Sequence, residues 1–369
     1  MKILVTGSKG FVGRNLVADL KVNKIGEVFE YDRDSSRDDL ERWTAEVDFI
    51  YHLAGVNRPE NEEEFMEGNF GFTSELLELL KKHNNKASIM ISSSIQAALD
   101  NPYGNSKKAG EDLMFQYAKE TGAKVYVYRF ANLFGKWSRP NYNTVVATFC
   151  HRIARNEEIQ VNNPEAPIEL TYIDDVVSEL KLALEDKAHK DGQFNYVPLT
   201  YQTTVGHVAD LIKSFKVSRE DLYVPNQEDG LSKKLYATYL SFLPENHFSY
   251  ELDMKSDDRG SFTEFLKSPE RGQVSINVAH PGITKGQHWH HSKNEKFLVV
   301  QGSGMIRFRK YGEEEVIEYP VSGKKLEVVD IPTGYTHSIV NTGEEDMVTV
   351  MWANEVFEPK KPDTYYEEV

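Results

Sequence analysis

Two patterns of hydrophobic and polar positions divide the chain. Up to about residue 245, amphipathic stretches alternate with the short apolar runs KILVTG, VDFIYHLAG, ASIMISSS and KVYVYRFAN. This alternation is typical of βαβ units around a buried parallel sheet. After Pro244 the chain changes to short alternating segments such as GQVSINVAH, EKFLVVQGSG and DMVTVMWAN. Short strands at regular spacing predict a sandwich or barrel, so we expect one domain over residues 1–245 and a second over 246–369.

Length and charge agree with this division and narrow the partners. The 369 residues suit two domains, and 43 Lys and Arg against 58 Asp and Glu give a formal net charge of −15. This charge argues against nucleic acid or an anionic membrane surface as the partner. No apolar run is long enough for a signal peptide or a membrane-spanning helix. The single cysteine, Cys150, fits a reducing compartment. We therefore expect a cytoplasmic protein, and a homodimer is the base-rate expectation.

A glycine-rich turn follows the first predicted strand, KILVT. Gly7, Gly10 and Gly13 stand at its junction with the helical pattern RNLVADLKV, with Phe11 and Val12 between them. Glycines at this spacing allow a tight turn and a close approach of the backbone to a diphosphate at the helix N-terminus. The position at the first strand–helix junction favours dinucleotide binding over an ordinary turn.

The residues expected to distinguish NAD from NADP follow the next strand, VFEYDR. Asp32 lies near the spacing at which an acidic residue binds the ribose 2′-hydroxyl. Arg33 would instead hold a 2′-phosphate, and Lys9 in the glycine turn adds a second cation. We expect NADPH, although Asp32 argues for NAD, and each of the three residues is equally well explained as a solvated loop charge.

A candidate catalytic set comes later in the same half. Ser94 closes the strand ASIMISSS, and Tyr103 and Lys107 stand four residues apart, which places them on one helix face. A nearby ammonium favours the phenolate, so we expect a lowered Tyr103 pKa and proton exchange with a carbonyl oxygen that Ser94 also contacts. A lone Y-x-x-x-K is common, but here it follows a glycine turn and strand-end serines in the right order.

At these residues the chain resembles the extended short-chain dehydrogenase/reductase family, whose members act on nucleotide sugars. The resemblance covers about residues 1–245, through TGSKGFVG, HLAG, SSS, PYGNSK, RFANLFG and YIDDVV. It implies a Rossmann-type α/β domain in which Tyr103 is the catalytic acid, with Lys107 and Ser94 as its partners. The cofactor-binding residues that we expect are Gly7, Lys9, Gly10, Phe11, Val12, Gly13, Asp32, Arg33, Leu53, Ala54, Gly55, Tyr103 and Lys107.

Three further positions belong to this comparison. Asn132 in RFANLFG matches a substrate-contacting position, although an Asn that closes a strand-end turn is an equal alternative. We expect Asp174 and Asp175 to cap the helix VVSELKLAL, without a role in the site. The chain departs from the family between Arg33 and HLAG, where fewer than 20 residues replace an extra strand and an acidic residue against the adenine.

The second half carries four candidate metal ligands. His288 and His290 are two residues apart and share one strand face, Glu295 opens the next strand, and His337 lies in PTGYTHSIVN. Three imidazoles and a carboxylate suit Zn²⁺, with Fe²⁺, Ni²⁺ or Mn²⁺ as alternatives. A single strand histidine is more often an ordinary polar side chain, but four such residues in one spaced pattern favour a metal site.

Both segments resemble the two cupin motifs, G-x5-H-x-H-x4-E-x6-G and P-x-G-x2-H-x3-N, except that Leu326 stands where a glycine usually precedes the second. The resemblance implies an all-β cupin barrel with His288, His290, Glu295 and His337 as its metal ligands. The segments DRGSFTE and KGQH also resemble the nucleotide-sugar 3,5-epimerases, metal-free cupins that deprotonate the carbon beside a 4-keto group.

The catalytic histidine of those epimerases matches His288, which has the spacing of a metal ligand. A bound metal would therefore act as a Lewis acid and leave the base to Lys285, Tyr335 or His291. Arg259 would contact a diphosphate, with a salt bridge at the rim as the alternative.

A nucleotide-sugar reductase joined to an epimerase-like cupin resembles the bifunctional enzymes of capsular polysaccharide synthesis. That resemblance implies a UDP-4-keto-6-deoxy-N-acetylhexosamine substrate, which the cupin epimerises at C3 because the 4-keto group acidifies that proton. The reductase domain would then reduce C4 with NADPH to UDP-N-acetyl-6-deoxy-talosamine, the precursor of UDP-N-acetyl-L-fucosamine. Two alternatives are a cupin that only binds or dimerises, and a redox-sensing protein without turnover, which the Ser94, Tyr103 and Lys107 set disfavours.

Overall fold

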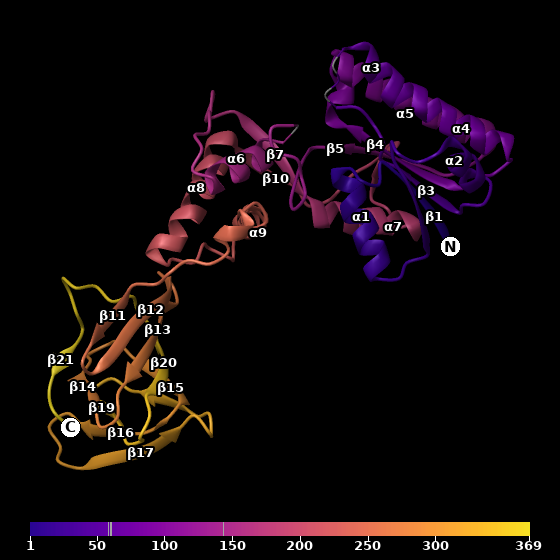
Figure 1. Cartoon of the computed structure of the whole chain (residues 1–369). Coiled ribbons are helices and arrows are strands. Elements are labelled where there is room, and N and C mark those ends of the chain that lie inside the picture. Colours follow the sequence, from indigo (N-terminus) through magenta and orange to yellow (C-terminus); the bar gives the residue numbers. More distant parts are fainter. Residues whose placement is uncertain (58, 60, 143) are drawn as a thin grey trace. The chain divides into compact units, whose positions relative to one another are not determined.

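The computed structural model describes residues 1–57, 59, 61–142 and 144–369 (Figure 1). The chain forms two compact units, one of Met1–Lys213 with Gln227–Pro244 and the other of Ser214–Asn226 with Glu245–Val369. Helix α8 (Val205–Asp221) crosses from the first unit into the second. The segment after it joins the second unit, because the backbone amide of Lys267 donates to the carbonyl oxygen of Leu222 at 2.8 Å. The predicted domain over 1–245 thus includes one segment that packs with the other unit.

The first unit is built on a seven-stranded sheet of order β2-β1-β3-β4-β5-β9-β8. Its pairings are parallel except for the β8–β9 hairpin. The strands are β1 (Lys2–Thr6), β2 (Glu27–Tyr31), β3 (Phe49–His52), β4 (Ser88–Ser94), β5 (Val125–Phe130), β8 (Lys190–Asp191) and β9 (Phe194–Asn195). The helices around it are α1 (Phe11–Val22), α2 (Arg37–Thr44), α3 (Glu63–Met66), the π-helix η1 (Glu67–Gly71), α4 (Phe72–Lys82), the 3-10 helix η2 (Ile95–Ala98), α5 (Pro102–Thr121) and α7 (Ile173–Leu184).

Helices cover both faces of this sheet, with α1 and α7 on one side and α4 and α5 on the other (Figure 1). Successive residues of β1 show why: Ile3 and Val5 pack with α1 and α7, whereas Leu4 packs with α4 and α5. A strand that is buried on both faces reads as a continuous apolar run, as KILVT does. The predicted Rossmann-type fold is confirmed.

A smaller sheet of order β10-β7-β6 completes the unit, with strands β6 (Asn132–Phe134), β7 (Pro167–Tyr172) and β10 (Tyr201–Thr204). Helices α6 (Val145–Ala154) and α9 (Gly230–Leu240) belong to the same part of the chain. One expectation here is wrong. Helix α7 has Tyr172 at its N-cap, so Asp174 and Asp175 lie in its first turn and cap nothing. They pair instead with Lys136 and Lys234, and their charges suit the helix dipole.

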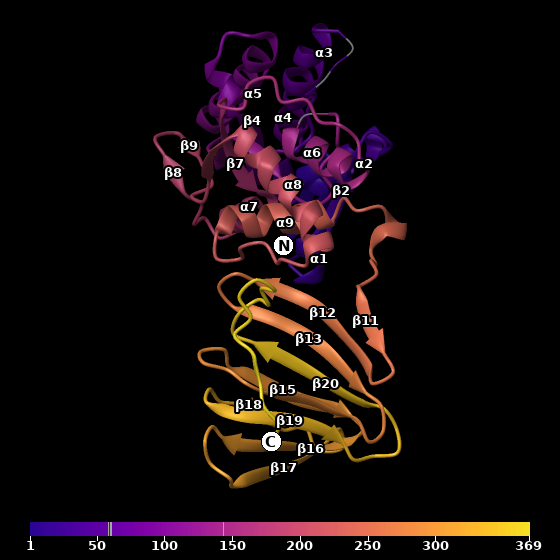
Figure 2. The ribbon, with the colours of Figure 1, turned by 90° about the vertical axis from the view of Figure 1, so that its left-hand side faces the viewer.

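The second unit consists of two antiparallel sheets, of orders β11-β12-β13-β20-β15-β18 and β17-β16-β19-β14-β21 (Figure 2). The strands are β11 (Met254–Asp257), β12 (Gly260–Ser268), β13 (Gly272–Ala279), β14 (Thr284–Trp289), β15 (Glu295–Gln301), β16 (Ser303–Lys310), β17 (Val316–Ser322), β18 (Val328–Ile331), β19 (Tyr335–Asn341), β20 (Met347–Ala353) and β21 (Tyr365–Tyr366), and the 3-10 helix η3 (Glu245–His247) precedes them. The core includes Phe297, Ile306 and Ile339, which come from both sheets. The predicted all-β second domain is confirmed.

Within the described residues, no helix combines the length and the apolar character needed to cross a membrane.

Candidate active site and metal centre

The glycine turn lies between β1 and α1 and packs against the end of β3. A Cβ on Gly7 would come within 2.7 Å of the Ala54 amide nitrogen, and a Cβ on Gly13 within 2.1 Å of the Gly7 carbonyl oxygen. Gly10 is the N-cap of α1 and makes no side-chain capping bond. The turn is therefore closed to side chains, and the first amides of α1 are available to an anion, as dinucleotide binding requires.

Asp32 connects this turn to the end of β2. Its carboxylate accepts hydrogen bonds from the backbone amides of Lys9 at 2.8 Å and Arg33 at 2.9 Å. The Lys9 ammonium pairs with Asp34, and that contact raises the pKa of Lys9. Arg33 is exposed. All three predicted selectivity residues therefore lie around one turn, and the preference for NADPH stays a prediction.

The structure brings Ser94, Tyr103 and Lys107 together. Asn101 caps α5 by accepting a hydrogen bond from the Gly104 amide at 2.8 Å, which fixes the start of the helix that carries both Tyr103 and Lys107. The Lys107 ammonium lies 5.9 Å from the centre of the Tyr103 ring. Ser94, at the end of β4, lies beside Tyr103 and lowers the pKa of its hydroxyl.

The expected lowering of the Tyr103 pKa is wrong for this structure. Burial raises the pKa of Tyr103, and the neighbouring Ser94 hydroxyl only partly opposes this effect. The Lys107 ammonium does not stabilise a phenolate here, because it faces the ring and donates to the carbonyl oxygen of Ser92 at 3.1 Å. Burial lowers the pKa of Lys107 to about 8. Tyr103 therefore stays protonated at neutral pH, which suits a proton donor.

Asn69 is a site residue that the sequence did not reveal. It is buried in the π-helix η1, where its side chain accepts from the Val56 amide and donates to the Ser106 hydroxyl, both at 3.0 Å. A Cβ on Gly55 would lie 2.7 Å from Asn69 Oδ1 and 3.0 Å from Lys107 Nζ. The HLAG glycine thus makes room for the lysine, but a lone asparagine in a helical stretch carries no recognisable signal.

Glu111 is a second such residue, one helical turn beyond Lys107. It is buried, accepts two hydrogen bonds from Arg129 at 2.8 and 2.6 Å, and accepts one from the Ser93 hydroxyl at 2.5 Å. Its charge opposes the burial effect on Lys107. The spacing of four residues from Lys107 is a signal that could have identified it.

The three predicted substrate-binding residues are engaged within the protein. Asn132 is exposed and donates to the carbonyl oxygen of Glu169 at 3.1 Å. Arg259 is exposed and pairs with Asp257 at 2.6 Å, which is the salt bridge of the alternative interpretation. Lys285 donates to the carbonyl oxygen of Val278 at 2.7 Å, and burial lowers its pKa. Their substrate contacts stay predictions.

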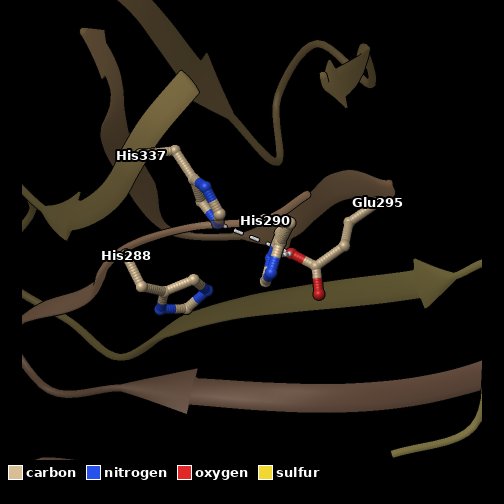
Figure 3. A group of neighbouring side chains, drawn as sticks. All are labelled: His288, His290, Glu295 and His337. Atoms are coloured by element: carbon tan, nitrogen blue, oxygen red, sulfur yellow. Dashed lines mark ion pairs between the residues drawn. The ribbon is translucent and has the colours of Figure 1, made fainter. Parts of the chain in front are cut away.

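The four predicted metal ligands converge in the second unit, with their side chains directed toward one another (Figure 3). His288 on β14 lies opposite His337 on β19, His290 follows the end of β14, and Glu295 opens β15. One ligand atom from each residue lies within 4.8 Å of the others. The Nε2 atoms of His290 and His337 are 3.6 and 3.5 Å from the same Glu295 oxygen, Oε2.

Unpartnered polar atoms show that this cluster fits a divalent cation. Among the described residues, His290 Nε2, His337 Nε2 and Glu295 Oε2 are buried without a hydrogen-bond partner, although such groups are nearly always paired. Burial lowers the pKa of His288 to about 4, assisted by the two neighbouring imidazoles, so it is neutral as a ligand must be. The donor set suits Zn²⁺ or a similar ion.

Comparison with known proteins covers both units. Residues 3–196 match the NAD dependent epimerase/dehydratase family, and residues 255–365 match the polysaccharide biosynthesis C-terminal domain. The chain is 47% identical over 365 residues to UDP-2-acetamido-2,6-beta-L-arabino-hexul-4-ose reductase of Pseudomonas aeruginosa, covering 99% of this chain and 98% of that protein.

Solved structures give the same picture. The crystal structure of the capsular polysaccharide assembling protein CapF from Staphylococcus aureus shares 55% identity and a TM-score of 0.95, and the match covers 100% of both chains. UDP-glucose 4-epimerase of Thermotoga maritima, at 23% identity and a TM-score of 0.56 over 66% of this chain and 98% of that one, resembles it in fold. With a family model across more than half its length and a relative matched from end to end, the chain belongs to the NAD dependent epimerase/dehydratase family.

Proposed function

We propose that this protein is an NADPH-dependent UDP-4-ketosugar reductase of capsular polysaccharide synthesis whose second unit epimerises C3 of the same sugar. The observation that carries the proposal is the convergence of Ser94, Tyr103 and Lys107 near the glycine turn. It is supported by full-length similarity to a protein named as a UDP-hexul-4-ose reductase. The substrate is a UDP-4-keto-6-deoxy-N-acetylhexosamine, and the product is UDP-N-acetyl-6-deoxy-talosamine.

Reduction at C4 needs a hydride and a proton. NADPH, when bound, supplies the hydride and leaves as NADP⁺. Tyr103, which burial keeps protonated, donates its hydroxyl proton to the C4 oxygen as the ketone becomes an alcohol. Ser94 lies beside the Tyr103 hydroxyl and would orient the same substrate oxygen. Lys107 holds its charge beside them through the Ser92 carbonyl oxygen.

Epimerisation at C3 removes a proton and returns one on the opposite face. His288, His290, Glu295 and His337 would hold a divalent metal, which supplies Lewis acidity when bound. Lys285 is our candidate for the proton-transfer group, because it is partly buried and burial lowers its pKa. His291, by comparison, is exposed and packs against Trp289 and Tyr365. Epimerisation must come first, because the C3 proton loses its acidity once C4 is reduced.

The test follows both reactions on the full-length protein. The UDP-4-ketosugar is incubated in D₂O with NADPH or NADH, and cofactor oxidation and deuterium at C3 are measured. Tyr103→Phe should abolish NADPH oxidation and spare exchange at C3. Tyr117→Phe is the matched control, because Tyr117 lies on the same helix and donates to the distant Asn85 carbonyl oxygen at 3.2 Å.

Metal removal completes the design. Treatment with a chelator should abolish exchange at C3, and the addition of Zn²⁺ should then restore it. Absence of exchange in the metal-loaded protein would leave a reductase with a non-catalytic cupin, and full oxidation of NADPH by Tyr103→Phe would refute the reductase site.

A further inference from the structure

The last described residues of the chain, 363–369, contact the part of the second unit that carries the predicted metal ligands. We call these residues the strap. The carbonyl oxygen of Asp363 accepts a hydrogen bond from His290 Nδ1. This bond places the proton on Nδ1 and directs Nε2, the atom left without a partner, toward the cluster. The orientation of one ligand is therefore set by a residue far away in the sequence.

The Asp363 side chain holds the loop on either side of that contact. Its carboxylate accepts from the backbone amides of His291 at 2.9 Å, Ser292 at 2.7 Å and Lys293 at 2.8 Å. The Ser292 hydroxyl adds a fourth hydrogen bond at 3.0 Å. These residues connect His290 to Glu295, so one carboxylate fixes the loop between two ligands.

The strap also pairs with the strand that carries the first ligand. Tyr366 lies opposite His288, and Tyr365 lies opposite Trp289, in the β14–β21 ladder. The β14–β19 ladder on the other side of β14 has a bulge beside His288, where Gln287 has a φ of 61°. The amide of Glu367 donates to the Gln287 carbonyl oxygen at 3.0 Å, and the amide of Val369 donates to Gln287 Oε1 at 2.9 Å. A left-handed conformation is costly for a residue other than glycine, so it persists only where the surroundings hold it.

The strap reaches Glu295 as well, through Lys293. The Lys293 ammonium lies 3.6 Å from Glu295 Oε1 and donates to the Thr364 hydroxyl at 3.4 Å. His337 takes its position from the pairing of β19 with β14 and β16, and among the described residues it has no strap contact of its own. The strap reaches its neighbour Thr336, whose hydroxyl donates to the Glu367 carboxylate at 3.3 Å.

We propose that the strap positions His288, His290 and Glu295 for the metal, with Asp363 as its principal positioning residue, so that metal binding and strap order stabilise each other. This inference rests on the proposed metal site. Loss of a residue that positions a metal ligand from the outer shell typically lowers metal affinity by about 10- to 100-fold. The coupling is reciprocal: whatever the strap adds to metal affinity, the metal adds to the order of the strap.

Zn²⁺ affinity of the full-length protein, measured in competition with a chromophoric chelator, tests the proposal. Asp363→Ala keeps the carbonyl oxygen but loses the carboxylate, so we expect affinity to fall about 10- to 100-fold. Asp346→Ala is the matched control, because Asp346 accepts from His280 Nδ1 at 2.7 Å and touches no predicted ligand. It should stay within about threefold of the original protein.

Hydrogen exchange supplies a readout that does not depend on activity. Zn²⁺ should slow exchange at the Glu367 and Val369 amides of the original protein, and should have no such effect in His337→Ala, which loses a ligand outside the strap. Where Asp363→Ala fails to fold, Asp363→Asn keeps one acceptor oxygen and should lose affinity to a smaller extent.

Two outcomes would overturn the inference in distinguishable ways. If the original protein binds no Zn²⁺, the metal site itself is refuted, and the strap proposal is refuted with it. If the original protein binds Zn²⁺ and the folded Asp363 variant binds it equally well, the metal site stands and the strap has no positioning role.

Discussion

Lys107 is a buried ammonium of the proposed reductase site, and its burial is a cost to the stability of the first unit. Burial lowers its pKa from 10.5 to about 8. At neutral pH, burial of the charged Lys107 therefore lowers the free energy of unfolding by about 3 kcal/mol. Because the folded pKa lies below the unfolded one, the penalty is complete below pH 8. It shrinks as the pH rises from 8 towards 10.5.

Replacement of Lys107 with Met removes the charge with little change in volume. Removal of the charge should stabilise the first unit at pH 7 by up to about 3 kcal/mol relative to the unsubstituted protein. Loss of the hydrogen bond to the Ser92 carbonyl oxygen should offset about 1 kcal/mol of this gain. The difference between the two proteins should shrink as the pH approaches 10, and NADPH oxidation should be lost at every pH.

The assay uses the single cysteine, Cys150, which is buried in α6 of the first unit. Pulsed thiol labelling in increasing urea reports opening of that unit alone, at pH 7 and at pH 10. Lys119→Met on the same helix is the control, because Lys119 is exposed and should show no such pH dependence. A stability difference between Lys107→Met and the original protein that does not change with pH would refute the reasoning.

Three further predictions follow from the same contacts. Gly13→Ala places a Cβ 2.1 Å from the Gly7 carbonyl oxygen and should abolish NADPH binding in a fluorescence titration. Gly71→Ala is the control, because the nearest atom to its Cβ is 3.9 Å away, and it should leave NADPH binding intact. Equal NADPH binding by the two variants would contradict this prediction. Glu111→Gln leaves Arg129 without its carboxylate and should destabilise the first unit by about 3 kcal/mol in the Cys150 assay. The same variant should move the alkaline limb of the pH–rate profile to lower pH, because the Glu111 carboxylate raises the pKa of Lys107. Asp112→Asn is the control, because Asp112 is exposed, and it should change neither the stability nor the alkaline limb. An unchanged limb in Glu111→Gln would show that Glu111 and Lys107 are not coupled. His337→Ala should eliminate Zn²⁺ binding and the thermal stabilisation of the second unit by Zn²⁺, as followed by calorimetry, and retained stabilisation would place the ion elsewhere.

The sequence by itself determined the fold classes and the groups whose members are close together along the chain. The apolar run KILVT, the glycines at 7, 10 and 13, the pair Tyr103 and Lys107, and the spacing of His288, His290 and Glu295 all follow local periodicities of a strand or helix. Such spacings fix which side chains share a face before any tertiary contact forms. They predicted several of the residues that meet in each candidate site, and the alternation of apolar and polar segments predicted both architectures.

Only the tertiary structure decided the environment of those groups. Asn69 and Asp363 contact the sites across separations that no local periodicity records, and Asp363 reaches His290 from 73 residues away. The Tyr103 pKa was predicted in the wrong direction because sequence spacing gives the distance to an ammonium but not the burial of the hydroxyl. Desolvation depends on everything packed around an atom, and that packing is supplied by distant segments whose positions are fixed only when the chain folds.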